Sequence, residues 1–431
     1  MFTRFLIAIY LLLTTSAFGT PNLNHPMTLT ELVDIALENH PSTRQAWWNA
    51  QRAVSALGSA KSAYYPTIGM QASATHGRDF KFINGPNTEY TIFGVDFNLS
   101  LLLFDFGERD ANVNATQMSL LAANWQVDRN IQEVMVHVLE NAYSTLHAQE
   151  TLKAAHTSLE DAERMLQAAQ ELNRAGITPI SDVYTSQATL AHMKMEFTQQ
   201  KSLLEIQKGK LAASLGLSAD VSLELVPLDL MPTVQKQHTS NLIALAYQQR
   251  ADLMAKRANV SESLYNLDKA CASYLPKLTL SGQGGANHYV HDKTYGAQYR
   301  ITLNLDIPLF EGFERIYNNR TAYANTKLSR QELDELQLNI ALEVLTHSRS
   351  LEAAQEMLPD ADEHLKNSVK AYESVLTKYQ VGKERIAELS NALRQVANAR
   401  VRYSDVKTRW LVSMANLAYA TGTLAPHTEA K

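Results

Sequence analysis

The side chains that could bind metals or act as nucleophiles are scattered along this 431-residue chain. The 13 His and 12 Met residues do not pair at ligand spacings, and a single cysteine, Cys271, excludes an intrachain disulfide or a cysteine-based metal site. The sequence contains no HExxH, GxSxG, P-loop or CxxC motif. We therefore expect no catalytic residue, metal site or cofactor, and we expect Cys271, in an Ala-rich segment, to be a small packing residue.

Polar side chains that could face water alternate with apolar ones in two stretches, residues 91–101 and 299–307. A period of two places the apolar set on one face of a strand and the polar set on the other. A polar face that carries charges suits a water-filled lumen. The candidate lumen-facing residues are Asp96, Asn98, Arg300, Asn304 and Asp306.

The strands that carry these residues are about ten residues long, the length that a tilted membrane strand needs. Residues 68–74 form a shorter alternating run, and a weaker run begins at Leu278 and dissolves into Gly282, Gly284 and Gly285. Aromatic residues near the strand ends fit the girdles of a membrane barrel: Tyr90, Phe104, Phe106, Tyr289, Tyr295, Phe310 and Phe313. A half-buried soluble sheet shows the same alternation, so both interpretations stay open here.

The chain is internally duplicated. The segment from Phe104 matches the segment from Phe310, an offset of 206 residues, and Pro66 matches Pro276, an offset of 210. We expect a first repeat at 20–217 with a strand pair at about 67–104, a linker at 218–239, a second repeat at 240–424 with a strand pair at about 277–309, and a tail at 425–431. Residues 1–19 read as a signal peptide.

Long helices follow each strand pair. Residues 108–174 lack proline and, at 1.5 Å per residue, predict a helix of roughly 100 Å. A helix of that length needs a partner, and a heptad stripe after Gly382 supplies one: Ile386, Leu389, Leu393, Val396, Tyr403 and Trp410, with Arg400 interrupting it. The equivalent stripe in the first repeat begins at Ile180 and Val183. Turns at Gly176 and Gly382 then predict two antiparallel helical hairpins.

Four strands cannot close a membrane barrel, and an open edge in lipid leaves backbone groups unpaired at several kcal/mol each. If the strands span a membrane, several copies must share one barrel. No later segment has about 18 consecutive apolar residues, so we expect no membrane-spanning helix. A formal net charge of -5 gives no reason to expect nucleic acid as a partner.

The order of these features resembles the TolC-like outer-membrane efflux and type I secretion channels. The matching residues are Leu29–Leu32 with the His40–Pro41 segment, Arg250–Leu253 in its place in the second repeat, the prolines before the strands, both glycine turns, and Leu215–Gly216 and Thr421–Leu424 at the repeat ends. The resemblance covers about residues 28–424. It implies a mainly helical homotrimer with one shared 12-stranded barrel in outer-membrane lipid and a helical tunnel across the periplasm.

The same resemblance implies a passive gated duct rather than an enzyme, docked through its hairpin tips at Gly176 and Gly382 to a periplasmic adaptor and an inner-membrane pump of the ABC or RND type. The cargo stays open among drugs, metals and proteins. The alternative is a soluble periplasmic coiled-coil scaffold, which explains the heptads but not the polar and apolar faces of the strands.

By the same resemblance, Asp182 and Glu388 fall on acidic positions of a closed entrance, each six residues after a turn glycine, and Tyr379 falls on a tip tyrosine. The second acidic position of the later tip is Asn391 here, which departs from a doubled acidic ring. Carboxylates that ring a pore favour cations. A carboxylate in a first helical turn also gains from the helix dipole without any further role, so that simpler interpretation stands beside the gate.

Overall fold

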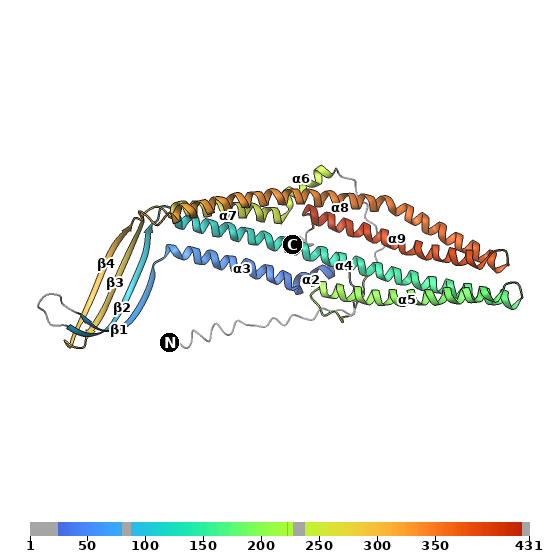
Figure 1. Cartoon of the computed structure of the whole chain (residues 1–431), viewed down its shortest axis with the longest axis horizontal. Helices are drawn as coiled ribbons and strands as arrows, with labels where there is room; N and C mark the ends of the chain where they lie inside the picture. Colours follow the sequence, from blue (N-terminus) through green and yellow to red (C-terminus); the bar gives the residue numbers. More distant parts are fainter. Residues whose placement is uncertain (1–24, 80–87, 222, 227–237, 425–431) are drawn as a thin grey trace.

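The computed structural model describes residues 25–79, 88–221, 223–226 and 238–424 of the chain. The molecule is elongated, with a sheet at one end and helices running from it to two hairpin tips at the other (Figure 1). The predicted signal peptide, the C-terminal tail and part of the predicted linker lie outside the described residues.

Each half of the chain contributes the same series of elements. The first half contains α2 (Leu29–Asn39), α3 (Pro41–Lys61), a short 3₁₀ helix (Ser62–Tyr64), β1 (Thr67–Asp79), β2 (Thr88–Phe104), α4 (Glu108–Arg174) and α5 (Ile180–Ser214). The second half contains α6 (Thr239–Gln249), α7 (Ala251–Ala272), β3 (Lys277–Tyr289), β4 (Thr294–Asp306), α8 (Glu314–Gln380) and α9 (Ile386–Thr421). The predicted fold class, mainly helical with four strands per chain, is confirmed.

Local sequence explains where the short helices begin and end. Thr28 and Glu31 form a capping box at the start of α2. Extended backbone at His40 separates α2 from α3, and Pro41 takes the first position of α3, where its missing N–H costs nothing. Arg250 has the same extended conformation between α6 and α7. The break at Pro41 therefore recurs in the second half without a proline.

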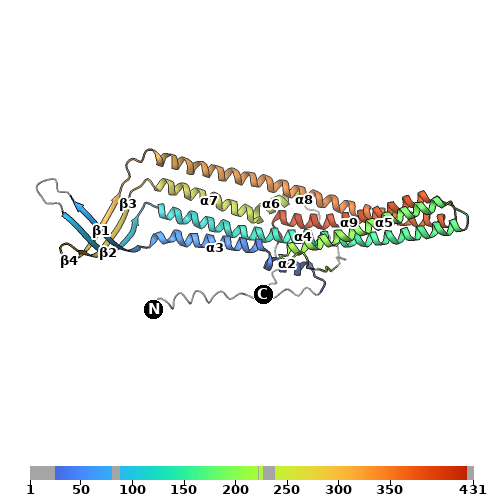
Figure 2. The same cartoon turned by 60° about the horizontal axis from the view of Figure 1, so that its bottom comes forward.

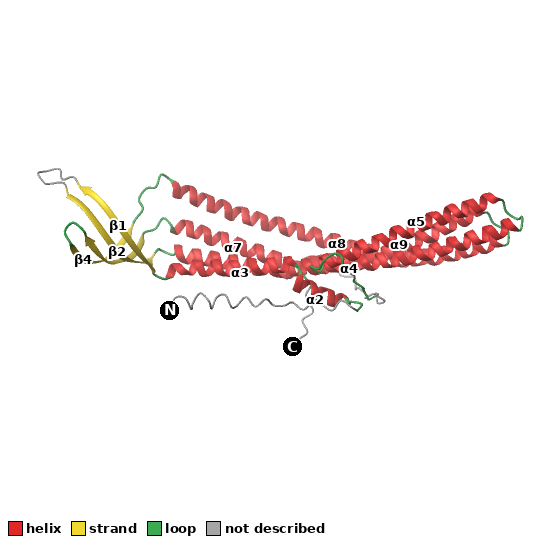
Figure 3. Ribbon diagram, turned by 90° about the horizontal axis from the view of Figure 1, so that it is seen from below, coloured by secondary structure: helices red, strands yellow, loops and turns green. Residues whose placement is uncertain are grey.

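The long helices pack as two hairpins, α4 with α5 and α8 with α9, and α4 also lies against α9 (Figures 2 and 3). One hydrophobic cluster near the tips draws residues from all four helices, including Met165, Val183, Leu376 and Leu389. The hairpins are thus joined to each other along their length through α4 and α9. This common core positions the two tips side by side.

The predicted heptad stripe is confirmed in α9, where Ile386, Leu389, Leu393, Val396 and Trp410 are buried. In α5 the equivalent stripe is only half covered: Val183 and Leu204 are buried, but Ile180 is 52% exposed. The difference follows from position, because α9 packs on both α8 and α4, whereas the main neighbour of α5 in the chain is α4.

The four strands form one antiparallel sheet in the order β1-β2-β3-β4. The prediction that the third strand dissolves after Leu280 was wrong, because β3 continues through Gly282, Gly284 and Gly285 to Tyr289. A Cβ atom at Gly285 would collide with the Asp96 carboxylate and the Val95 carbonyl of β2. The glycine permits a close approach of strands and does not end the strand.

Among the described residues, no helix combines the length and apolarity that a membrane crossing demands. Cys271 is exposed rather than packed as predicted, and its Sγ atom accepts a hydrogen bond from Asn319 at 3.4 Å. The Ala-rich sequence around Cys271 belongs to α7, and its position on the helix turns this side chain to the surface.

Candidate functional site

The sheet presents one polar face, which contains all five predicted polar residues. Residues that lie opposite each other in neighbouring antiparallel strands point to the same side. Asp96 lies opposite Gly285, and Gly285 lies opposite Gln298, whose Nε2 atom donates to Asp96 Oδ1 at 3.4 Å across the glycine. The same register places Asn98, Arg300, Asn304 and Asp306 on this side with Gln283, Ser281 and Lys277.

The opposite face is apolar across all four strands. Leu101, Leu280 and Leu303 form one row, and Ile68, Leu99 and Ile301 belong to another that passes Gly282. These side chains are not covered in the single chain: Ile301 is 76% exposed and Tyr299 is 88% exposed. A continuous exposed apolar face marks a surface made for a nonaqueous environment or a partner.

Aromatic residues lie at both ends of the sheet, as predicted. Near the helices, Phe104 packs edge-on against Phe106 at 4.6 Å, and Phe310 packs edge-on against Phe313 at 5.4 Å. At the far end, the ring of Tyr295 stacks on His288 at 4.2 Å, and Tyr90 and Tyr289 lie in the neighbouring strands. By the strand register Tyr295 lies on the apolar face, whereas Tyr90 and Tyr289 lie on the polar face, so only part of the predicted girdle at the far end borders the apolar face.

Equivalent arginines hold the junctions between strands and long helices. Arg109 Nη1 donates to the carbonyl of Leu102 at 3.0 Å, and Arg315 Nη1 donates to the carbonyl of Pro308 at 2.8 Å. The Arg109 guanidinium also lies over the ring of Tyr64, and the Arg315 guanidinium lies over the ring of Tyr274, the equivalent tyrosine of the second repeat. The same contacts in both repeats fix the angle at which the sheet leaves the helices.

At the other end of the molecule, glycines turn the two hairpins. Gly176 and Gly382 have φ of 75° and 72°, a left-handed conformation that glycine adopts without steric cost. In the first tip the Ile177 N–H donates to the Leu172 carbonyl at 2.9 Å, and in the second the Lys383 N–H donates to the Lys378 carbonyl at 2.9 Å. Ile177 also lies against Gly382, so the tips touch each other.

The structure brings two of the predicted gate residues together. The Tyr379 hydroxyl on α8 donates to Asp182 Oδ2 on α5 at 3.3 Å, while the tyrosine ring is fully buried in the core near the tips. Burial, reinforced by the negative charge of Asp182, raises the pKa of Tyr379 to about 12. The phenol is therefore a proton donor at every physiological pH and joins one hairpin to the other.

The other two predicted gate residues do not take part in this contact. Glu388 lies exposed in the first turn of α9, and Asn391, one turn further, contacts Arg394 of the same helix. Both side chains face away from the core of the single chain. A role for them at an entrance would depend on surfaces that further copies present.

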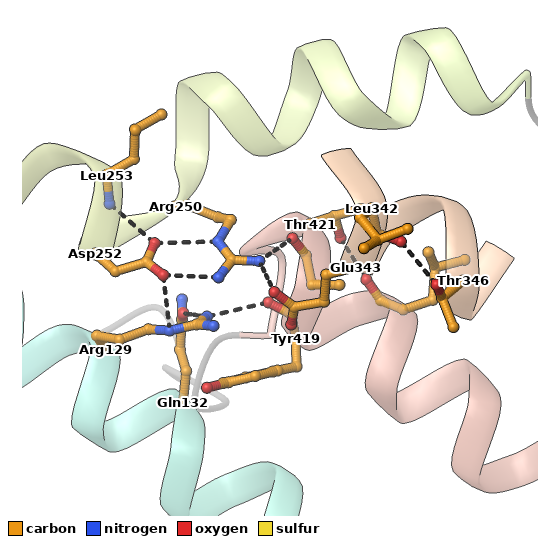
Figure 4. A network of polar contacts seen from close by, with 12 residues as sticks. Arg129, Gln132, Arg250, Asp252, Leu253, Leu342, Glu343, Thr346, Tyr419 and Thr421 are labelled. Carbon is orange, nitrogen blue, oxygen red and sulfur yellow. Dashed lines mark hydrogen bonds and ion pairs between the residues drawn. The ribbon is translucent and has the colours of Figure 1, made fainter. Parts of the chain in front are cut away.

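A buried polar network, which the sequence showed only as a motif, joins the α6–α7 break to α4, α8 and α9 (Figure 4). Arg250 pairs with both oxygens of Asp252 at 2.6 and 3.0 Å and with Glu343 at 2.7 Å. Arg129 lies 3.5 Å from Asp252 and stacks over the ring of Tyr419 at 3.7 Å. Two arginines and two carboxylates thus balance one another in the middle of the molecule.

Arg400, which interrupts the heptad stripe, also has a structural reason. Its Nη2 atom lies 2.9 Å from the carboxylate of Asp161, a residue with no exposed surface, and its Nη1 atom donates to Ser158 at 2.9 Å. The Asp161 carbonyl accepts from the buried Tyr372 hydroxyl at 3.1 Å. An unpaired basic residue in an apolar stripe was the available signal for a buried acidic partner on α4.

The fold and these surfaces define a class of protein: the sequence model of the outer membrane efflux protein family matches residues 32–217 and 242–423, and the chain belongs to that family. Its members are passive channels of the outer membrane and not enzymes. Predicted membership, location and lack of catalysis are confirmed by this match. Membership of an outer-membrane family also argues against the alternative of a soluble periplasmic coiled-coil scaffold.

Particular proteins similar to this chain agree with the family. The chain is 27% identical over 399 residues to protein CyaE of Bordetella pertussis, covering 90% of this chain and 83% of that protein. It is 22% identical over 406 residues to outer membrane protein TolC of Vibrio cholerae, covering 92% and 91%. The solved outer-membrane channel OprN has the same fold, with a TM-score of 0.83, 18% identity, and coverage of 91% and 89%.

Proposed function

We propose that three copies of this chain form a gated exit duct of a tripartite efflux or type I secretion system. The observation that carries this proposal is the four-stranded sheet with one polar face, one exposed apolar face and aromatic residues near both of its ends. Such a sheet suits lipid on one side and water on the other, and closure with the strands of further copies satisfies its edges.

The helices support the second half of the proposal. Each long helix has 67 residues, about 100 Å at 1.5 Å per residue, which suits a tunnel that crosses the periplasm. The two tips then lie at the inner end, where a periplasmic adaptor and an inner-membrane pump of the ABC or RND type would dock at the turns of Gly176 and Gly382. Tyr379 and Asp182 would hold the entrance closed, and Glu388 and Asn391 would face its opening.

Fractionation and conductance together test this function. The protein is expected in the outer-membrane fraction, soluble only with detergent, and the purified protein is expected to give discrete current steps in a planar lipid bilayer. Recovery in the soluble periplasm would remove the channel and restore the scaffold alternative. If the Tyr379→Phe variant, which is expected to open the entrance, is recovered in the membrane but gives no conductance, the protein is an outer-membrane protein but not a duct.

A further inference from the structure

Two edges of the sheet are open in the described chain, the outer edges of β1 and β4, because each of these strands has one neighbour in the order β1-β2-β3-β4. An edge strand presents a row of backbone donors and acceptors that lipid cannot satisfy. The inference below rests on the shared barrel proposed above and specifies how two copies join at these edges.

The duplication in the sequence states which strand residues are equivalent. Pro66 and Pro276 precede the first strand of each repeat, and Phe104 and Phe310 follow the second. By these landmarks β1 is equivalent to β3, and β2 is equivalent to β4.

The structure agrees with this equivalence residue by residue. Ser73 is equivalent to Gln283 and Gly94 to Arg300 by the two sequence offsets. Ser73 pairs with Gly94 in the first hairpin, and Gln283 pairs with Arg300 in the second. The two hairpins therefore share one register although the offset changes by four residues in the loop between the strands.

The chain also contains the junction that links one repeat to the next. In this β2–β3 junction Asn98 lies opposite Gln283. The equivalents of these residues are Asn304 on β4 and Ser73 on β1, which are the two open edges. We propose that β4 of one copy pairs antiparallel with β1 of a second copy, with Asn304 opposite Ser73.

The faces of the sheet agree with this register. It places Thr302 opposite Thr75 on the polar face and Leu305 opposite Ala72 on the apolar face. A shift by one residue would place every polar residue of β4 against the apolar face of β1, which the side-chain period forbids. Shifts by two residues keep the faces matched and are the alternatives that an experiment must separate.

Cysteine pairs separate these registers in the full-length protein, in a Cys271→Ser background that removes the one native thiol. The test variant carries Asn304→Cys with Ser73→Cys, and two matched variants carry Asn304→Cys with Gln71→Cys or Thr75→Cys. Directly opposite Cβ atoms are about 5 Å apart and diagonal ones about 7–8 Å, whereas a disulfide needs about 4 Å. Within one chain, Ser73 lies in the same row as Gly296 of β4, and Asn304 is eight residues further along that strand. Ser73 and Asn304 of one chain are therefore roughly 30 Å apart, so a disulfide must join two chains.

We expect disulfide-linked chains in the outer-membrane fraction at least about fivefold more abundant with Ser73→Cys than with either shifted partner, following the difference in Cβ separation. A second set of variants tests the apolar face and combines Leu305→Cys with Ala72→Cys, or with Met70→Cys or Ala74→Cys as the shifted partners. Successive opposite pairs alternate between hydrogen-bonded and non-hydrogen-bonded geometry, so if one set cannot form a disulfide for this reason, the other set can. More product with a shifted partner overturns the register. No product in either set, with membrane recovery and conductance retained, overturns the junction alone, whereas recovery in the soluble periplasm overturns the proposed function.

Discussion

The hydroxyl of Tyr379 donates to Asp182 across 3.3 Å, and this contact ties α8 to α5 close to where both hairpins turn. The phenol is buried and the carboxylate is partly exposed, so breaking the contact leaves Asp182 able to bind water while Tyr379 loses its acceptor. A single hydrogen bond of this kind is worth about 0.5–1.5 kcal/mol. In the entrance proposed above, a bond of this size would favour the closed state and would still be weak enough for a docked adaptor to break.

Tyr379→Phe removes the hydroxyl and keeps the ring, so we expect the open state to gain about fivefold in population, the equivalent of about 1 kcal/mol. The measurement is the fraction of time that single channels conduct in planar bilayers. Tyr247→Phe is the matched control, because that hydroxyl donates to the Gln337 carbonyl at 3.0 Å in a different part of the molecule. Equal effects of the two substitutions would argue against a specific role for Tyr379.

Glu388→Gln tests the entrance charge without changing the size of the side chain. We expect the preference for cations over anions to fall and block by multivalent cations to weaken, because exposed carboxylates at a narrow opening attract cations. Reversal potentials across a salt gradient measure the selectivity, and the conductance that remains as a multivalent cation is added measures the block. Glu335→Gln, an exposed acidic residue of α8 far from the tips, is the control. Unchanged selectivity in Glu388→Gln would leave that carboxylate with only the helix dipole as its role.

The network around Arg250 predicts a pH dependence of stability. Burial alone would raise the pKa of Asp252, but hydrogen bonds from Arg250 and the charge of Arg129 outweigh it and hold the pKa below its ordinary value of 3.8. A lowered pKa means that the ionised carboxylate stabilises the folded state above pH 3.8. That contribution is lost as pH falls through the lower folded-state pKa.

Asp252→Asn should therefore destabilise the protein at pH 7 by about 3–5 kcal/mol, the cost of breaking one partner out of a buried pair. The difference from the unmodified protein should begin to shrink as pH falls below the ordinary pKa of 3.8 and should be smallest below the lower folded-state pKa, where the carboxylate is neutral in both states. Thermal unfolding followed by circular dichroism measures it. Asp405→Asn, in a more exposed pair with Arg409, should change the midpoint little. A pH-independent effect of Asp252→Asn would contradict the charge argument.

Gly285→Ala tests the close approach of β2 and β3. The added methyl group would meet the Asp96 side chain and the Val95 carbonyl, so we expect the oligomer proposed above to dissociate at a lower temperature, as measured by gel electrophoresis after heating in mild detergent. Gly296→Ala is the control, because a Cβ atom there meets nothing within 4 Å. If both variants dissociate at the same temperature, the contact across Gly285 does not limit the sheet.

The sequence predicted repeating features well because each rests on a local period. Alternation over residues 91–101 located a strand, and heptad spacing from Ile386 located a buried stripe. Contacts between elements distant in sequence were harder: nothing local shows that Arg250 meets Glu343 or that Arg400 meets Asp161. Those pairs depend on which helices become neighbours.

The failed predictions have the same origin. Glycines in β3 looked like a strand end, because a local pattern cannot reveal that Asp96 occupies the space above Gly285. Cys271 looked like a core residue because its neighbours are small. The resemblance to the TolC-like channels proposed both Asp182 and Tyr379 as gate residues, but only the way in which the two hairpins come together near the tips placed them in contact.

Helices α4 and α8 have the same length, 67 residues each, and this equality fixes the distance from the sheet to both hairpin tips. One residue inserted in α4 alone would rotate everything beyond it by about 100° and advance it by 1.5 Å, which would separate Asp182 from Tyr379. Lengths should therefore change by whole heptads, about 10 Å at a time, in all four arms of the hairpins together. A duct fitted to a wider or narrower periplasm would have to evolve in such steps.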